Sequence, residues 1–254
     1  MTRLQQLYCL GVHSLAWLLQ VLQSKKKKAM IYLIFIAITI LSYSVQQSLK
    51  SKFQKYSRIP IGGGMRGQDV ARRMLSDNRI AGVQVTSTRG TLTDFYNPSN
   101  LTVNLSEGVY EANSVAAAAV AAHECGHAVQ HATGYGPLRL RTALVPAVEF
   151  ASQWVTWVIL AGILLVQVFP AVLGIGVVLF AVTTLFSFIT LPVEIDASRR
   201  AIQWLERSGI TQGETTAMAK DALRSAAYTY VVAALGSLAT LVYYAMIFFG
   251  NRRD

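Results

Sequence analysis

The sequence predicts a mainly α-helical membrane protein with four transmembrane helices and a small α+β domain that carries a short β-meander. Two observations support this fold class. Hydrophobic residues make up 53% of the 254 residues and charged residues only 14%, a composition too apolar for an ordinary soluble domain. In addition, three long stretches of the chain carry no charged residue: 29–49, 150–193 and 226–250.

The lengths of these uncharged stretches set the number of predicted spans. A bilayer core of about 30 Å needs about 20 helical residues, so the first and last stretches fit one span each. The middle stretch, 150–193, is long enough for two. Pro170 lies near its centre, where the chain can turn. We therefore expect residues 150–193 to form a transmembrane hairpin.

The net charge of +10 is better explained by a membrane than by nucleic acid. Basic residues flank the predicted spans, where they bind anionic headgroups and influence orientation. They are Lys25, Lys26, Lys27, Lys28, Lys50, Lys52, Lys55, Arg199, Arg200, Arg252 and Arg253. We expect the lipid bilayer as a partner and no nucleic acid.

The polar segments divide the chain into further parts. Residues 1–28 form an N-terminal extension, whose first 24 residues carry a weak apolar stripe and either lie on the membrane surface or form an ordinary tail. Residues 50–149 are expected to form the small domain. Residues 194–225 are expected to form two helices broken near Ser208-Gly209. The spans then take residues 29–49, 150–193 and 226–250.

Within the small domain, the hydrophobic period changes from helix to strand and back. Residues 69–80 have helical spacing, and three β-prone runs follow, which predict a three-stranded meander. These runs are 83–88, 92–96 and 101–105. An alanine-rich helix should then begin at Asn113 or Ser114 as N-cap and end near Thr133, before Gly134.

This alanine-rich helix carries the strongest chemical motif. His123-Glu124-Cys125-Gly126-His127 matches the H-E-x-x-H pattern. Residues i and i+4 share a helix face, so the two imidazoles can bind one tetrahedral Zn²⁺. Glu124 is rotated by about 100° around the helix, which suits a general base acting on water better than a ligand. Cys125 points away from the shared face and is expected to pack in the core.

A catalytic zinc site keeps three protein ligands and one open position. His131 lies about 12 Å along the helix axis from His123, so we expect it beside the site or on the surface. Glu194 is the stronger candidate, because it is the first charged residue after the predicted hairpin. The hairpin has an even number of spans, so it returns Glu194 to the membrane face of the histidines.

The residues around Glu194 have more ordinary expected roles. Asp196 and Arg200 are spaced i, i+4 and should form a helical ion pair. Ser198, one turn after Glu194, is expected to hold its carboxylate.

The chain resembles the YugP-type membrane-bound neutral zinc metallopeptidases, relatives of the HtpX-like gluzincins. The resemblance covers residues 50–250 and is carried by Leu92–Pro98, Ala121–His131 and Leu191–Ala201. It implies a zincin-like catalytic domain, one Zn²⁺ per chain on His123, His127 and Glu194, and Glu124 as catalytic acid and base. The HtpX-like pattern has aspartate four residues after the third ligand, where this chain has Ser198.

The resemblance also raises expectations about substrate. It implies that residues 101–105 are the edge strand that pairs with extended peptide. Arg200 and Tyr228 are candidate oxyanion donors, although packing or headgroup contact is the commoner role for each. Peptides or membrane proteins are the expected substrates, and oligomeric state is left open.

Two other functions compete with this hydrolase. A site-2-type intramembrane protease would place the motif inside a span, but residues 115–122 are too short and alanine-rich. A non-catalytic membrane protein with structural metal would need four ligands and no base. The basic residues of both polar segments favour a plasma-membrane protein with a cytoplasmic active site, whereas the flanks at 25–28 and 252–253 favour the reverse.

Overall fold

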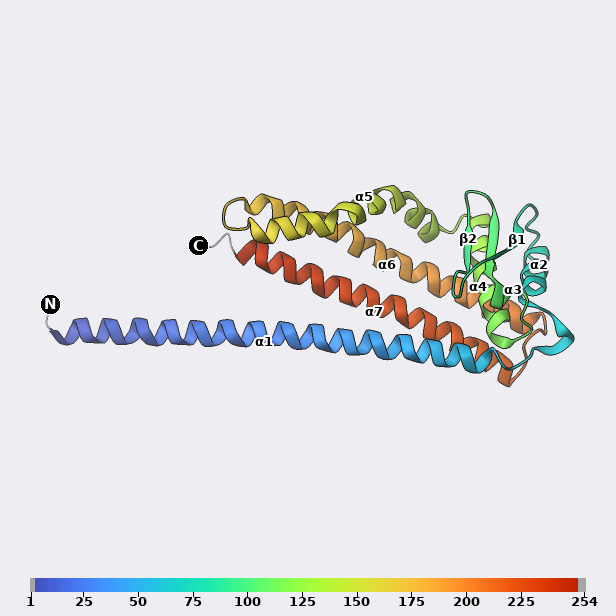
Figure 1. Cartoon of the computed structure of the whole chain (residues 1–254), viewed down its shortest axis with the longest axis horizontal. Helices are drawn as coiled ribbons and strands as arrows, with labels where there is room; N and C mark the ends of the chain where they lie inside the picture. The colour runs from blue at the N-terminus through green and yellow to red at the C-terminus, as the bar shows by residue number, and fades with distance from the viewer. Residues whose placement is uncertain (1–2, 251–254) are drawn as a thin grey trace. The chain divides into compact units, whose positions relative to one another are not determined.

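The computed structural model describes the backbone of residues 3–250 and the side chains of residues 30–250. The apolar stripe expected within residues 1–24 lies outside the described side chains. By its internal contacts the chain divides into Met1–Leu41 and Ser42–Asp254, and all packing below lies within the second unit. The helices (Figure 1) are α1 (Arg3–Tyr56), the short 3₁₀ helix η1 (Gly62–Gly64), α2 (Gly67–Asp77), α3 (Glu107–Tyr110), α4 (Val115–Ala132), α5 (Gly136–Leu164), α6 (Pro170–Arg207) and α7 (Glu214–Gly250).

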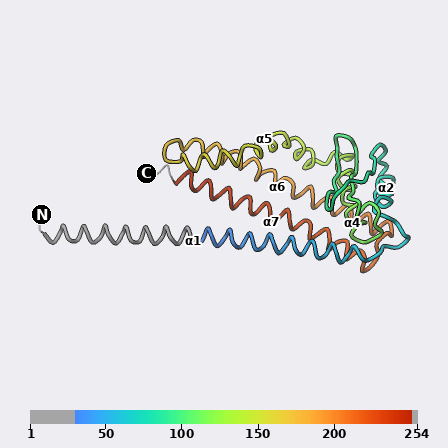
Figure 2. The backbone as a smooth tube through the Cα atoms, viewed as in Figure 1, coloured from blue at the N-terminus to red at the C-terminus, as the bar shows by residue number. Residues whose placement is uncertain are grey.

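Among the described residues, four helices are long and apolar enough to cross a membrane. They are α5, α6, α7 and the part of α1 over Met30–Tyr56. Helices α5 and α6 lie side by side as a hairpin (Figures 1 and 2). The chain turns at residues 165–169, and Pro170 begins α6, where its fixed φ and missing N–H suit a first helical position. The turn lies where the sequence placed it.

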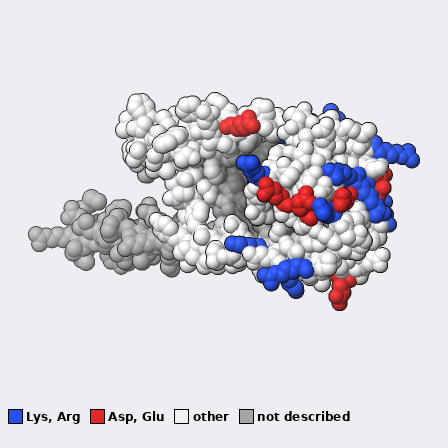
Figure 3. All heavy atoms as spheres, turned by 45° about the vertical axis from the view of Figure 1, so that its right-hand side comes forward, with Lys and Arg blue, Asp and Glu red and all other residues white. Residues whose placement is uncertain are grey.

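Charged and apolar surfaces are segregated within the second unit. Figure 3 shows Lys, Arg, Asp and Glu gathered toward the part that carries α2 and the sheet, whereas much of the remaining surface is white. Large apolar side chains stand exposed along the long helices, among them Trp157, Val178 and Phe249, each more than half exposed. Exposed apolar surface of this extent on helices of spanning length suits contact with lipid.

The helix boundaries differ from those expected at residues 149 and 194. Helix α5 begins at Gly136, inside the segment assigned to the small domain, and α6 continues through Glu194 to Arg207 without a break. Pro146 and Pro192 lie inside these helices and end neither of them. A change from apolar to charged side chains alters the surroundings of a helix but does not stop its backbone hydrogen bonding.

The expected pair of helices over residues 194–225 is therefore wrong in two respects. Its first helix is the end of α6, and its second is the start of α7, which continues through residue 226 to Gly250. The break between them falls at residues 208–213. Gly209 and Gly213 both have positive φ there, 71° and 53°, a conformation that glycine adopts without steric cost. The break near Ser208-Gly209 was predicted correctly.

The predicted meander is wrong, although its three strands exist. Strands β1 (Gln84–Thr88), β2 (Phe95–Asn97) and β3 (Thr102–Ser106) form a sheet in the order β1-β3-β2. Strand β3 pairs parallel with β1 and antiparallel with β2. Val103 and Leu105 of β3 are fully buried, whereas β1 and β2 have no buried residue. The most buried strand takes the centre, and β2 pairs with the edge of it that β1 leaves open.

Helix α4 lies in the core and is held by small side chains. Its N-cap is Ser114, one of the two residues predicted for this position. The Ser114 hydroxyl accepts a hydrogen bond from the Ala117 amide. The alanines of residues 116–122 are buried against neighbouring elements. Cys125 is buried as expected, with its Sγ 3.5 Å from the Ala71 carbonyl oxygen on α2.

Helices α4 and α6 approach each other most closely at Gly126. A Cβ atom at residue 126 would lie 2.6 Å from the Ala197 carbonyl oxygen and 3.1 Å from the Ala197 Cα. Both neighbours are backbone atoms, so neither can move aside without shifting α6. Only glycine permits this crossing.

Replacing Gly126 with alanine should therefore destabilise the chain. Overpacking of a tight contact costs about 1–3 kcal/mol, although alanine is otherwise the better helix former. Thermal unfolding in detergent measures the effect. Gly108→Ala is the matched control, because a Cβ at residue 108 meets no atom within 4 Å. Equal unfolding temperatures for the two variants would contradict the close crossing.

Candidate metal centre

Three predicted ligands meet where α4 crosses α6. His123 and His127 lie one turn apart on α4, and Glu194 lies on α6. Glu194 Oε2 is 3.3 Å from His123 Nε2 and 3.7 Å from His127 Nε2. All three ligand atoms lie within 4.8 Å of one another. The Glu194 side chain is 4% exposed and the histidines 14% and 10%, so the group is largely shielded from bulk water.

The donor set fits a zinc ion on two grounds. Two ligand atoms on a tetrahedral zinc at about 2.0 Å lie about 3.3 Å from each other, close to the two distances between Glu194 Oε2 and the imidazoles. In addition, Glu194 Oε2 is a buried acceptor that receives no hydrogen bond from any residue the structure describes. A buried acceptor in native structures normally has a partner, and a cation between the two imidazoles and this oxygen would provide one.

The second oxygen of Glu194 has its own contact. Arg141 Nη1, on α5, lies 3.4 Å from Glu194 Oε1, a long hydrogen bond with opposite charges. Tyr230, on α7, also lies close enough to this carboxylate to interact with it electrostatically. The two oxygens are therefore used differently: Oε1 faces Arg141, and Oε2 faces the histidines.

Gln130 sets the proton position on His127. The Gln130 side-chain amide donates to the Val193 carbonyl oxygen at 2.8 Å and to Asp196 Oδ2 at 2.9 Å. Its oxygen consequently faces His127 Nδ1, at 3.0 Å, and accepts a hydrogen bond from the N–H group at that position. In the neutral imidazole, Nε2 then carries the lone pair. A ligating histidine needs this tautomer.

Ser198 contacts a different residue from the one expected. Its hydroxyl lies 3.1 Å from His123 Nδ1, whereas the sequence predicted a contact with Glu194. Residue 198 lies one turn beyond 194 on the same helix, so its short side chain points across to α4. The hydroxyl restrains the His123 ring, but it can donate or accept and therefore does not fix the ring proton as the Gln130 oxygen does for His127.

Glu124 lies between the two histidines in sequence and is 8% exposed. Burial raises the pKa of the Glu124 carboxyl, against the opposing effect of His123 and His127, and Glu194 and Asp94 raise it further. A carboxyl group with a raised pKa can both accept and return a proton closer to neutral pH.

The other predicted residues lie outside this group. The Tyr96 hydroxyl lies 2.8 Å from His131 Nδ1, so His131 links α4 to β2. Arg200 pairs with Asp196 at 2.6 Å, as expected for an i, i+4 pair, and stacks over Tyr135. Asp196 also pairs with Arg199. Tyr228 lines a groove between α6 and α7.

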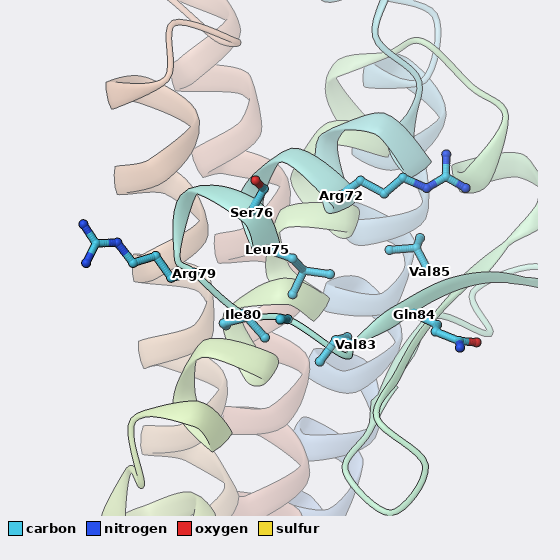
Figure 4. Close-up of a pocket in the computed structure, with 9 residues that line it drawn as sticks. Arg72, Leu75, Ser76, Arg79, Ile80, Val83, Gln84 and Val85 are labelled. Carbon is cyan, nitrogen blue, oxygen red and sulfur yellow. The ribbon is translucent and has the colours of Figure 1, made fainter.

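Sequence reasoning missed Gln130, Arg141 and Tyr230. Gln130 had a usable signal, because it lies three residues after His127 as a polar residue on an otherwise small and apolar helix. Arg141 and Tyr230 had none, because each reaches Glu194 from a separate helix. A separate hollow of about 670 Å³ lies between α2 and β1 (Figure 4), and none of the residues named above lines it. Its lining includes Leu75 and Val83, with Arg72 and Arg79 at its margins.

The fold and this site define a chain of long apolar helices with a His-His-Glu metal-binding group, a ligand set typical of catalytic zinc. The chain belongs to the family described as "Putative neutral zinc metallopeptidase", which matches residues 31–249. It is 42% identical over 226 residues to "Putative membrane protease YugP" of Bacillus subtilis (strain 168), covering 87% of this chain and 100% of that protein. No solved structure matches the chain.

Replacing Gln130 with methionine should weaken zinc binding about 10–100-fold, the usual effect of removing a residue that orients a ligand. Methionine keeps the side-chain volume but has no oxygen to accept the hydrogen bond from His127 Nδ1. Competition with a chromogenic chelator measures the affinity. Gln54→Met, at an exposed position of α1, is the control. An unchanged affinity in the Gln130 variant would show that His127 needs no such partner.

Proposed function

We propose that this chain is a membrane-embedded zinc endopeptidase. His123, His127 and Glu194 hold one Zn²⁺ per chain. The observation that carries the proposal is the buried Glu194 Oε2, which faces both imidazoles and has no hydrogen-bond partner within the described part of the chain. Membership of a zinc metallopeptidase family supports the choice of metal.

The chain's own residues divide the work of peptide hydrolysis. Zinc, when bound, supplies a Lewis acid that polarises the scissile carbonyl and makes water a better nucleophile. Glu124 accepts the proton of the attacking water and later returns it to the leaving amine. Gln130 and Ser198 hold the imidazoles in the ligating orientation. Arg141 keeps Glu194 turned so that Oε2 faces the histidines.

Strand β2 is the better candidate for binding an extended substrate. The sequence assigned this role to residues 101–105, but β3 is the central strand and both of its edges are paired. Strand β2 has a free edge and contacts α4. Asp94 anchors the start of β2, because it accepts hydrogen bonds from the Ser106 amide at 2.7 Å and hydroxyl at 3.0 Å. A peptide would add to this edge by backbone pairing.

The competing functions have less support. A structural zinc site uses four protein ligands, whereas the group among the described residues offers three. A site-2-type protease needs its motif in a spanning helix, and α4 is not among the described helices that are long and apolar enough to span. The buried Glu124 beside the ligands also favours a catalytic site.

We further propose that the metal centre lies at the cytoplasmic face of the plasma membrane. The hairpin of α5 and α6 would return the chain to the membrane face where it started. Helix α7 would then cross the bilayer once, so Glu194 and Gly250 would lie on opposite faces. Basic residues are frequent in residues 50–149 and 194–225, and such residues favour the cytoplasmic side.

Replacing Glu124 with glutamine should abolish peptide cleavage and leave zinc binding intact. The amide cannot accept the proton, and general-base loss costs about 10²–10⁴-fold in rate. Zinc content by mass spectrometry and cleavage of a fluorogenic peptide are measured on the same preparation. Glu107→Gln, at an exposed position of α3, is the control. Equimolar zinc without cleavage in the unsubstituted chain would favour the structural alternative.

The same inactive variant tests the substrate strand. With an uncleaved peptide bound, amide hydrogen exchange should slow in β2, because its free edge becomes paired. Strand β1, the other edge of the sheet, is the internal control and should not change. Protection confined to β1 would place the substrate on the opposite edge.

A reporter enzyme fused after Gly250 tests the orientation. With four spans and a cytoplasmic metal centre, residue 250 lies outside the cytoplasm. A reporter that works only after export should therefore be active there, and a reporter that works only in the cytoplasm should be inactive. A second fusion within the exposed loop at residues 89–93 should give the opposite result. Cytoplasmic activity of the Gly250 fusion would reverse the proposed orientation.

A further inference from the structure

A groove between α6 and α7 lies outside the proposed zinc ligands and has a volume of about 550 Å³. One stripe of each helix lines it, from Ile195 to Glu206 on α6 and from Lys220 to Val231 on α7. The helices pack against each other and are joined by the short segment 208–213, so they run antiparallel. Glu206 and Lys220 therefore lie at the loop end of the groove, and Ile195 and Val231 at the other end.

The loop half of the groove is basic. Lys220 and Arg224 are both exposed, and neither forms an ion pair with any residue in the described part of the chain. Arg199 also lines the groove, although Asp196 pairs with it. Glu206, at the loop end, repels an anion there. The two unpaired cations of α7 are consequently the favoured position for a negative group.

The other half of the groove is open, and its α7 side is apolar, while Ile195, Ser198 and the Asp196-paired Arg199 line its α6 side. Ile195 is 53% exposed and Tyr228 49% exposed, and Ala227 and Val231 lie between the same helices. The uncharged stretches of α6 and α7 begin at this end, at residues 193 and 226. In the proposed membrane, this end lies beside acyl chains while Lys220 and Arg224 lie at the level of the headgroups.

We propose that this groove binds one anionic phospholipid, with its phosphate on Lys220 and Arg224 and the upper part of an acyl chain against Tyr228 and Val231. The proposal rests on the proposed embedding in a membrane but not on peptide cleavage. Along α7, the unpaired cations and then the apolar side chains follow the same order as the headgroup and chain of a lipid. Basic pockets between membrane helices are known to favour such headgroups.

Native mass spectrometry of the detergent-purified chain tests the proposal. Phosphatidylglycerol and phosphatidylcholine with identical acyl chains are added to the Glu124→Gln variant, which removes any dependence on cleavage. Phosphatidylglycerol should be retained selectively, and Lys220→Gln with Arg224→Gln should lower its retention on the order of tenfold. Arg58→Gln with Arg79→Gln removes two exposed charges outside the groove and should change retention less than twofold.

Three outcomes would overturn the proposal. They are equal retention of the two lipids, equal loss in both double variants, and displacement of phosphatidylglycerol by an uncleaved peptide substrate. The last would assign the groove to substrate instead. Unfolding temperatures of the two double variants should match, because all four positions are exposed. A chain that cleaves peptides but shows no lipid selectivity would leave the proposed peptidase standing and refute only the lipid site.

Discussion

The close crossing of α4 and α6 is the constraint on which the metal-binding group depends. Packed helices usually lie 8–10 Å apart, and small residues allow a nearer approach. At Gly126 the backbone of α6 comes so near that no Cβ fits. This approach brings Glu194, a residue with a short reach, within 3.7 Å of both imidazoles. The alanines that precede the motif extend the same packing toward α2, so one face of α4 supports the core while the other presents the histidines.

Gln130 joins this packing to the chemistry of the ligands. Its amide spans α4 and α6, because it contacts His127 on its own helix and both Val193 and Asp196 on the other. A buried amide is stabilising only when its groups are satisfied, and here both acceptors of the NH₂ group come from α6. The contact that fixes the relative position of the helices therefore also fixes the proton on His127. A change in the crossing would alter the ligand tautomer.

Much of this arrangement could be predicted from sequence, and the failures have physical causes. The four apolar helices, the turn before Pro170 and the cap at Ser114 depend on local composition, and they were found. The pairing of β1 with β3 was missed, because strand order follows burial rather than chain order. Strand β3, which carries the buried Val103 and Leu105, takes the centre of the sheet. Helix spacing placed His123 and His127 on one face, and the charge after an apolar stretch indicated Glu194. Arg141 could not be found, because no local pattern records a contact between separate helices.

The unsatisfied oxygen of Glu194 links metal binding to stability. Leaving a buried acceptor without a partner costs about 1–3 kcal/mol, and Arg141 does not relieve this cost because it faces the other oxygen. The carboxylate nevertheless stays between the helices, since Arg141 and the packing around Gly126 hold it there. A cation bound between Oε2 and the imidazoles would remove the cost only in the folded chain, where α4 and α6 meet. Zinc binding must therefore favour the crossed arrangement of these helices over any in which they separate.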